Sequence, residues 1–219
     1  LDAVGLSVLI PGGGEKYVIK DTSLSISPGT FSTLSGPPGS GKSLLLNCLG
    51  GISVPSQGKV TYSGCEMLKF ASSKFSNCVG YVNQYPHLFD SSLLDNISMN
   101  DSSIPISRIQ NLIQSLNFNF SFDPENSDLY SKSIKVLNLS EIDKIQLFLL
   151  RSLIRKPKLL IIDDIFQSLD PDYTLQILRS IQPFVFSLLI VSNNEKIVSS
   201  LPTNFFIQNQ QVIDGAFSS

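Results

Sequence analysis

The chain has 219 residues, of which 42% are hydrophobic and 16% are charged, and its formal net charge is -2. This length fits one globular domain with an ample core. The near-neutral charge gives no general attraction to nucleic acid or to anionic membranes, so we expect no nucleic-acid partner.

Cysteine and histidine are scarce, with three separated cysteines and one histidine. This usage argues against a zinc site and favours reduced thiols in a cytosolic compartment. No signal-like segment opens the chain, and no apolar run reaches the roughly 18 residues of a membrane span. The first residue is Leu1 and not Met, which suggests a segment of a longer protein.

The N-terminal third is rich in β-strand patterns. Short apolar runs at 6–10 and 17–19 are separated by the turn sequence Pro-Gly-Gly-Gly at 11–14. Apolar residues alternate with serines at 24–26, and another strand pattern follows at 59–62. We predict a series of strands on either side of a phosphate-binding unit.

Residues 36–43 read GPPGSGKS, a complete G-x-x-x-x-G-K-[ST] motif between a predicted strand at 30–34 and a predicted helix at 44–49. The glycines let consecutive backbone N–H groups face an anion, to which the helix adds its positive N-terminal end. Lys42 supplies a charge for the β- and γ-phosphates, and the Ser43 hydroxyl can ligate Mg²⁺. The alternative is a glycine-rich turn with a chance lysine. The predicted nucleotide-binding residues are Gly36, Pro37, Pro38, Gly39, Ser40, Gly41, Lys42 and Ser43.

The central region is more helical. Apolar residues at helical spacing span 109–116, a loop-rich stretch follows at 117–133, and a second apolar stripe runs from near Ser140 to 154. The sequence Arg-Lys-Pro at 155–157 closes that helix.

A continuous apolar run at 159–162 is typical of a strand buried in a parallel sheet, and it ends in Asp163 and Asp164. Ligands of such sheets bind outside the carboxyl ends of the strands. Asp163 is therefore placed to hold, directly or through water, the Mg²⁺ that Ser43 holds from the other side. The alternative is a solvated acid pair after a strand. Further strands are predicted at 188–191 and 205–207.

The order of these motifs resembles that of ATP-binding cassette (ABC) nucleotide-binding domains over essentially the whole chain. After the phosphate-binding loop come Tyr81-Val82-Asn83-Gln84, Leu139-Ser140, the helix with Arg151, the strand ending at Asp163, and Ser168-Leu169-Asp170. Residues 88–97 are similar to the exporter branch in particular, where this run borders the docking site of the transmembrane domain.

The resemblance implies an α/β P-loop NTPase fold with a mixed RecA-like core sheet, an N-terminal antiparallel β subdomain and an α-helical subdomain. One nucleotide-binding domain would span 1–219, with the core and β subdomain at 1–90 and 155–219 and the helical subdomain at 91–154. Members of the family bind ATP with Mg²⁺ and pair with a second nucleotide-binding domain and a transmembrane domain, at the cytoplasmic face of a membrane.

The resemblance also implies roles for single residues. Gln84 would reach the Mg²⁺ and sense the γ-phosphate, so the implied metal ligands are Ser43, Gln84 and Asp163. Asp170 would lie in the D-loop at the interface between two such domains.

The segment that aligns with the family's LSGGQ signature departs from it. It reads Leu-Ser-Glu-Ile-Asp at 139–143, so both glycines are missing and the Glu141 carboxylate lies where a phosphate of the opposite subunit should approach. Two like charges about 4 Å apart repel by about 4 kcal/mol at an effective dielectric constant near 20, unless Glu141 turns away. Ser140 and Asp143 also fit a capping box, and the alternative is a simple helix N-terminus.

The implied catalytic residues are Gln84, Asp164 and Asn193. Asp164 takes the place of the glutamate that polarises the attacking water, and a misplacement of about 1 Å costs on the order of 10²-fold in rate. Asn193 replaces the switch histidine, and an amide can donate a hydrogen bond but cannot carry a proton at neutral pH. We therefore predict slow hydrolysis, and we expect the only histidine, His87, to be a surface or docking residue.

Two further departures concern ligand contacts. Ile10 falls where the family stacks an aromatic residue on adenine, and Tyr17 is an alternative for that role. The exporters' glycine-containing segment before the signature is not recognisable at 130–138.

An ABC site is composite, since one chain gives the P-loop and acids and the other gives the signature. We therefore interpret this chain as the degenerate half of an asymmetric exporter, which binds ATP mainly to hold the dimer closed. Three alternatives stay open: a fully active transport ATPase, a non-catalytic nucleotide-sensing module, and an ABC-type ATPase acting on DNA or ribosomes. The exporter-like run at 88–97 argues against the last.

Overall fold

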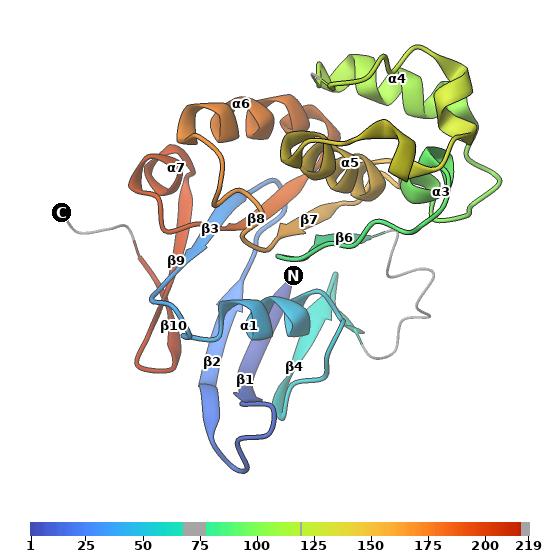
Figure 1. Cartoon of the computed structure of the whole chain (residues 1–219). Helices are drawn as coiled ribbons and strands as arrows, with labels where there is room; N and C mark the ends of the chain where they lie inside the picture. The colour runs from blue at the N-terminus through green and yellow to red at the C-terminus, as the bar shows by residue number, and fades with distance from the viewer. Residues whose placement is uncertain (68–77, 119, 216–219) are drawn as a thin grey trace.

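The computed structural model describes residues 1–67, 78–118 and 120–215 (Figure 1). A four-stranded antiparallel sheet has the order β2-β1-β4-β5. Its strands are β1 (Asp2–Leu9), β2 (Tyr17–Ser25), β4 (Gln57–Tyr62) and β5 (Cys65–Glu66). This arrangement confirms the predicted antiparallel β-sheet.

Strand β2 is longer than the sequence pattern predicts, because it runs without a break from the apolar run at 17–19 into the alternating stretch that begins at 24. Register shifts between β1 and β2 keep Leu6 opposite Thr22 and Val8 opposite Ile19. Asp21 adopts a left-handed backbone with φ of 44° between these pairs. Such bulges absorb residues that break the alternation, so the polar stretch bends the strand without ending it.

The second sheet has six strands in the order β10-β9-β3-β8-β7-β6. They are β3 (Phe31–Ser35), β6 (Val79–Val82), β7 (Leu159–Ile162), β8 (Ser187–Val191), β9 (Thr203–Gln208) and β10 (Gln211–Asp214). Only β10 runs antiparallel to its neighbour in this sheet. The predicted mixed sheet of an α/β fold is therefore confirmed.

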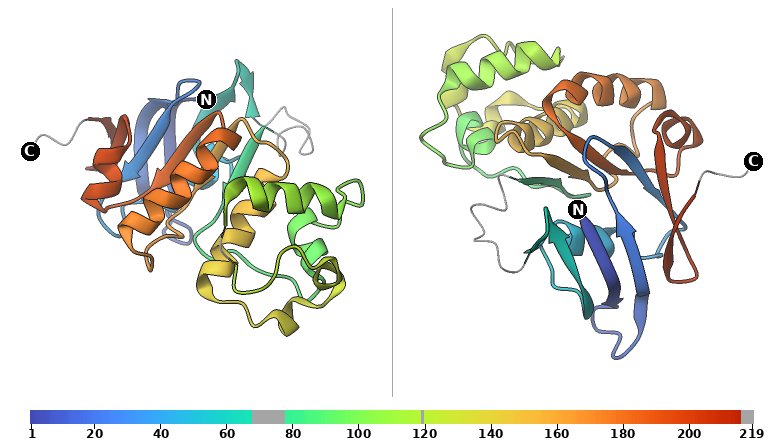
Figure 2. Two further views of the ribbon diagram at one scale, coloured as in Figure 1. Left: turned by 90° about the horizontal axis from the view of Figure 1, so that it is seen from above. Right: turned by 180° about the vertical axis from the view of Figure 1, so that it is seen from behind.

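Helices cover the sheets from two sides. The α-helices are α1 (Lys42–Leu49), α3 (Leu93–Ser98), α4 (Ile106–Leu116), α5 (Glu141–Leu153), α6 (Pro171–Ile181) and α7 (Glu195–Ser200), and the 3-10 helices are η2 (Ser127–Ser131), η3 (Ile134–Leu137) and η4 (Gln182–Phe184). The views in Figure 2 place α3, α4 and α5 together at one end of the molecule. In the described part of the chain, no helix has both the length and the apolar character that crossing a membrane requires.

Strand β7 separates two hydrophobic clusters. Leu160 and Ile162 pack with helices α3 to α6, whereas Leu159 and Ile161 pack with α1 and the antiparallel sheet. The two sets alternate because successive side chains of a strand point to opposite faces. All four residues are buried, as the continuous apolar run predicts. The division into subdomains at 91 and 154 stays a prediction.

Arg151 of α5 fixes the segment that follows Gln84. Its guanidinium donates to the backbone carbonyls of His87 and Asn96, at 2.9 and 2.7 Å, and lies 5.4 Å from the centre of the Phe89 ring. The buried Asn96 side chain completes the contact, since it exchanges hydrogen bonds with both backbone groups of Phe89. As predicted, the His87 side chain is at the surface.

The N-terminus of α5 is closed by its own side chains, which confirms the predicted capping box. Asp143 is 1% exposed, and its carboxylate accepts hydrogen bonds from the backbone N–H groups of Ser121 and Ser140, both at 2.8 Å. Both serine hydroxyls also donate to it. Burial raises the pKa of Asp143, but the hydrogen bonds from Ser121 and Ser140 outweigh burial and lower the pKa overall.

We expect Asp143→Asn to lower the free energy of unfolding at pH 7 by about 2 to 4 kcal/mol, because it weakens several buried charge-assisted hydrogen bonds. Since the pKa of Asp143 is lowered in the folded state, its contribution is complete above the ordinary pKa of about 3.9 and is lost as the pH falls through the folded value. Urea unfolding at pH 7, 5 and 3 measures this. The exposed Asp90, paired with exposed Lys135, gives the control Asp90→Asn, which should cost less than about 1 kcal/mol. A stability difference between wild type and Asp143→Asn that does not shrink at low pH would contradict the assignment.

Candidate functional site

The phosphate-binding motif has the predicted strand-loop-helix setting, between the end of β3 at Ser35 and the start of α1 at Lys42. Gly41 is the N-cap of α1 and has φ of 93°. A Cβ atom at Gly41 would lie 2.7 Å from Cγ2 of Val18 in β2, so both the backbone conformation and the space require glycine. The middle of the loop, Pro37 to Gly39, is exposed.

The Lys42 ammonium group lies over its own loop. It donates hydrogen bonds to the carbonyl oxygens of Gly36 and Pro37, at 2.7 and 3.0 Å. Burial lowers the pKa of Lys42, while the negative charges of Asp164 and Asp163 act in the opposite direction. The ammonium group thus lies in the field of both acids that follow β7.

Asp163 lies at the carboxyl end of β7 and is 2% exposed. Its Oδ1 atom is buried without a hydrogen-bond partner of normal geometry. Burial raises the pKa of its carboxyl, and hydrogen bonding with the Ser43 hydroxyl lowers it. A buried carboxylate oxygen without a partner is costly unless a cation or a donor meets it, and an oxygen pair from Asp163 and Ser43 suits Mg²⁺.

No group of three or more His, Cys, Asp or Glu side chains within the described ranges could form a metal site. This agrees with the preference of Mg²⁺ for one or two carboxylates together with phosphate oxygens and water.

Asp164 has a left-handed backbone with φ of 52°, a conformation that aspartate tolerates better than most residues. Its carboxylate accepts a hydrogen bond from the Gln167 side chain. Burial raises the pKa of this carboxyl, and the Gln167 hydrogen bond and the Lys42 charge lower it.

Asp164 also lines two cavities of the site. It lines one of about 570 Å³ with Gln84 and another of about 380 Å³ with Asn193. The three residues predicted to be catalytic therefore border two cavities that have Asp164 in common.

Asn193 contacts the phosphate-binding loop directly, a contact that the sequence analysis missed. Its Oδ1 atom accepts a hydrogen bond from the backbone N–H of Gly36 at 3.0 Å. The two residues are 157 positions apart, so no local pattern reports their contact.

A cleft of about 790 Å³ opens beside the loop. It is lined by Ile10, at the position of the family's stacking aromatic residue, and by Tyr17, the alternative for that role. The cleft is also lined by Gln208, Asn209 and Gln210 at the turn between β9 and β10. The Gln210 carbonyl accepts the N–H of Lys20 in β2 at 2.8 Å, which brings this turn against the antiparallel sheet. No sequence pattern predicts that this turn lines the cleft, because its polar residues are ordinary for a hairpin.

At the position of the family's signature, Glu141 turns back along its own helix. Its carboxylate forms an ion pair with the Lys144 ammonium group at 2.5 Å, and the Glu141 side chain is 76% exposed. The charge is therefore partly balanced, but the two glycines expected in a signature remain absent.

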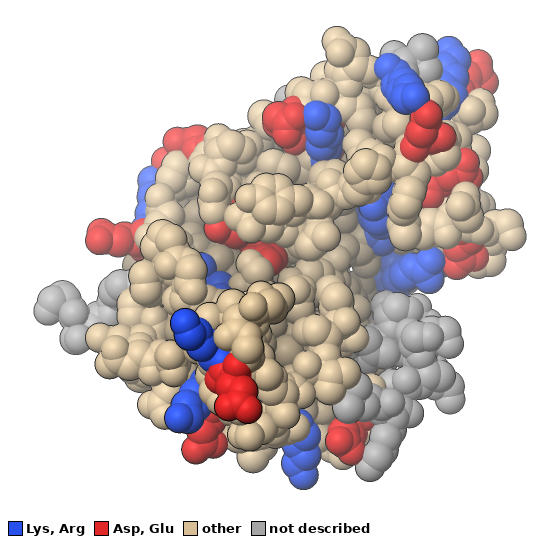
Figure 3. Space-filling view, turned by 60° about the horizontal axis from the view of Figure 1, so that its bottom comes forward, with Lys and Arg blue, Asp and Glu red and all other residues tan. Residues whose placement is uncertain are grey.

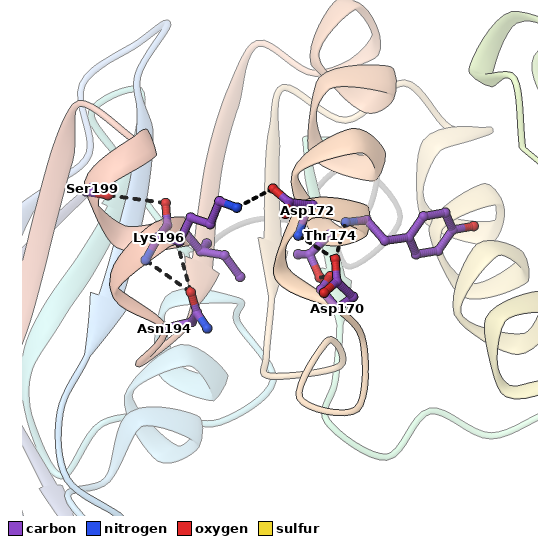
Figure 4. A network of polar contacts seen from close by, with 8 residues as sticks. Asp170, Asp172, Thr174, Asn194, Lys196 and Ser199 are labelled. Carbon is purple, nitrogen blue, oxygen red and sulfur yellow. Dashed lines mark hydrogen bonds and ion pairs between the residues drawn. The ribbon is translucent and has the colours of Figure 1, made fainter.

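The segment that contains Asp170 connects to the one that contains Asn193 (Figure 4). Asp170 is the N-cap of α6, and its carboxylate accepts the backbone N–H groups of Asp172 and Tyr173 at 2.9 and 3.2 Å. Lys196 of α7 forms an ion pair with Asp172 at 2.5 Å. The predicted D-loop aspartate is thus a helix cap, next to an ion pair between α6 and α7.

Charges of both signs are interspersed on the face shown in Figure 3, with uncharged surface between them. This distribution agrees with the formal net charge of -2 of the sequence.

A family model for ABC transporters matches residues 19–167. The chain is 32% identical over 157 residues to the human ABC-type oligopeptide transporter ABCB9, a match that covers 71% of this chain and 20% of that protein. It is 29% identical to ABC transporter B family member 1 of Dictyostelium discoideum, with 71% of this chain and 17% of that protein covered. It is also 26% identical to the methionine import ATP-binding protein MetN of Chlamydia pneumoniae, over 92% of this chain and 61% of that protein.

The fold is similar to that of a bacterial Atm1-family ABC exporter solved with ATP bound. The TM-score is 0.85 at 16% sequence identity, and the match covers 98% of this chain and 38% of that one. The chain spans about a fifth of the length of the B-family relatives it matches. The chain therefore belongs to the ATP-binding cassette transporter family, and it has the fold of the nucleotide-binding domain of the family's exporters.

Proposed function

We propose that this chain binds Mg-ATP as the nucleotide-binding domain of an exporter-type transporter, with weak or absent hydrolysis in its own site. One observation carries the proposal: the Oδ1 atom of Asp163 is buried at the end of β7 without a hydrogen-bond partner of normal geometry, in a site where Lys42 of the P-loop adds an attractive charge. A triphosphate with its divalent cation would complement both groups.

Ser43, Gln84 and Asp163 would hold the Mg²⁺. When bound, this ion would supply positive charge that neutralises part of the charge of the phosphates. The backbone N–H groups from Gly39 onward and the Lys42 ammonium group would bind the phosphates from the other side. Lys42 would exchange its two loop carbonyl acceptors for phosphate oxygens.

Weak hydrolysis follows from how the two substituted residues are held. The Asp164 carboxylate is shorter than a glutamate and accepts a hydrogen bond from Gln167. Asn193 has no titratable group, and its Oδ1 atom accepts the Gly36 N–H. The shorter reach of the Asp164 carboxylate and the lack of a titratable group at position 193 therefore support weak hydrolysis.

The signature segment supports an asymmetric pair. In a homodimer, both composite sites would meet the exposed Glu141 and Lys144 and the internally capped helix α5. A partner domain with an intact signature would complete the site on this chain's P-loop. We infer that this chain pairs with such a domain and with a transmembrane domain at the cytoplasmic face of a membrane.

Replacing Lys42 tests nucleotide binding. Lys42→Ala should weaken Mg-ATP binding by about 10- to 100-fold, because a hydrogen bond to a charged group contributes about 1.5 to 3 kcal/mol. Calorimetry or displacement of a fluorescent ATP analogue measures this, with the exposed Lys59 of β4 giving the control Lys59→Ala. If wild type fails to bind Mg-ATP at millimolar concentration, or if both variants bind like wild type, the proposal is wrong.

Restoring the family's residues tests the origin of slow hydrolysis. We expect little phosphate release from wild type and a gain of roughly 10²-fold when Asp164→Glu is added to a Glu141→Gly/Ile142→Gly background. Asp164→Asn in the same background is the matched control and should give no gain. Fast, Lys42-dependent release by the unmodified chain would instead favour a fully active transport ATPase. Mg-ATP binding without turnover in any variant or with any partner would favour a nucleotide-sensing module.

A further inference from the structure

Tyr81 lies between the P-loop helix and the acid at the end of β7. Its hydroxyl donates to Oδ1 of Asn47 in α1 at 2.9 Å and is 3.5 Å from Oδ2 of Asp163. The second contact is long for a hydrogen bond. Tyr81 is thus the side chain that joins α1 to the Oδ2 atom of Asp163, while the Oδ1 atom of Asp163 has no partner.

The sheet register explains why these groups meet. Tyr81 of β6 lies opposite Ile161 of β7, and the N–H of Asp163 donates to the carbonyl of Val82 at 2.8 Å. Tyr81 packs with the cluster that includes Ile161 and α1. Asp163 is two residues after Ile161, so its side chain falls on that same face.

Gly50, the residue that ends α1, holds the Tyr81 ring in place. A Cβ atom at Gly50 would lie 2.6 Å from Cδ2 of Tyr81, so the ring rests directly on the backbone of α1. Gly50 has φ of -83°, which other residues also adopt, so close packing and not backbone conformation requires glycine here. The ring is therefore confined between Gly50 and Asp163.

The hydroxyl has one proton for two acceptors. A phenol has an ordinary pKa of about 10, so the Tyr81 hydroxyl keeps its proton at neutral pH. The shorter contact directs this proton to Asn47, so the longer contact with the Asp163 carboxylate is at most a weak hydrogen bond. The Tyr81 hydroxyl thus fills the space beside Oδ2. It limits rotation of the carboxylate without forming a strong hydrogen bond to it.

We propose that Tyr81 is a positioning residue for the divalent cation, and that it orients the Asp163 carboxylate so that Oδ1 faces the ion. This inference rests on the proposed binding of Mg-ATP. It goes beyond that proposal because it assigns metal affinity to a side chain that touches neither the ion nor the nucleotide. Partners of metal-ligating carboxylates commonly change metal affinity by 10- to 100-fold.

The test separates the contribution of the metal from that of the nucleotide. The dissociation constant of ATP is measured with excess EDTA and with increasing Mg²⁺, for wild type and for Tyr81→Phe. We expect the variant to need about tenfold more Mg²⁺ to reach half of the Mg²⁺-induced change in ATP affinity. This value is at the low end of the 10- to 100-fold range because the contact between Tyr81 and Asp163 is long. Its affinity for metal-free ATP should equal that of wild type.

Two further variants control the result. Tyr130 is fully buried, and its hydroxyl donates to the carbonyl of Pro124 away from the site, so Tyr130→Phe removes a buried hydroxyl without changing the Mg²⁺ requirement. Gly50→Ala keeps the phenol but displaces the ring, and it should raise the Mg²⁺ requirement as Tyr81→Phe does. If circular dichroism shows that Tyr81→Phe fails to fold, Gly50→Ala decides the question.

The outcomes distinguish the two proposals. If wild type binds no ATP, with or without Mg²⁺, the proposed function fails. If wild type binds Mg-ATP and the folded Tyr81 and Gly50 variants need no more Mg²⁺ than wild type, the role of Tyr81 is refuted while nucleotide binding stands. An equal loss of affinity for metal-free and metal-bound ATP would also refute it, because Tyr81 would then support the P-loop as a whole.

Discussion

The site depends on one buried carboxylate, that of Asp163, placed at the end of a strand with no exposed residue. A charge at such a place is costly unless other groups compensate it. Lys42 supplies an attractive charge, and the Ser43 hydroxyl forms a hydrogen bond with the carboxyl group. The Tyr81 hydroxyl contacts its Oδ2 atom. Lys42 and Ser43 come from α1, which packs on one face of the core sheet, and the Tyr81 side chain of β6 lies on that same face. Burial still raises the pKa of Asp163 overall, so these groups offset the cost of the buried charge only in part.

The sequence predicted the parts of this arrangement that are local. The phosphate-binding motif, the apolar run of β7 and the Ser140 cap each depend on neighbouring residues, and the structure has each of them where the pattern placed it. The continuous course of β2 was missed, because the bulge near Asp21 exists only through pairing with β1. Hydrophobic alternation alone cannot report a partner strand.

Long-range contacts within the site could not be predicted from the sequence for a similar reason. Asn193 meets Gly36 across 157 positions, and Tyr81 meets Asp163 across 82. Each contact is fixed by the order of strands in the core sheet, which single-chain patterns do not specify. The substitution of asparagine for histidine was visible in the sequence, but its contact with the loop backbone required the fold.

The closed N-terminus of α5 and the open P-loop end of α1 show two uses of the same structural element. Helix N-termini carry unpaired N–H groups and attract anions. In α5, Ser140 and Asp143 occupy these groups, and Asp143 is further tied to Ser121. In α1 no side chain caps the first turn. Side chains of the protein thus occupy part of one helix end, and the other retains capacity for an external anion.

The contact between Gly41 and Val18 makes the phosphate-binding loop depend on the position of β2 in the antiparallel sheet. Because β2 lies directly against the N-cap of α1, a bulkier residue at position 18 would push the start of that helix outward even if the motif itself were intact. A homologous chain with an unchanged GPPGSGKS motif could therefore still lose its anion-binding pocket through a substitution in β2, which lies outside the motif.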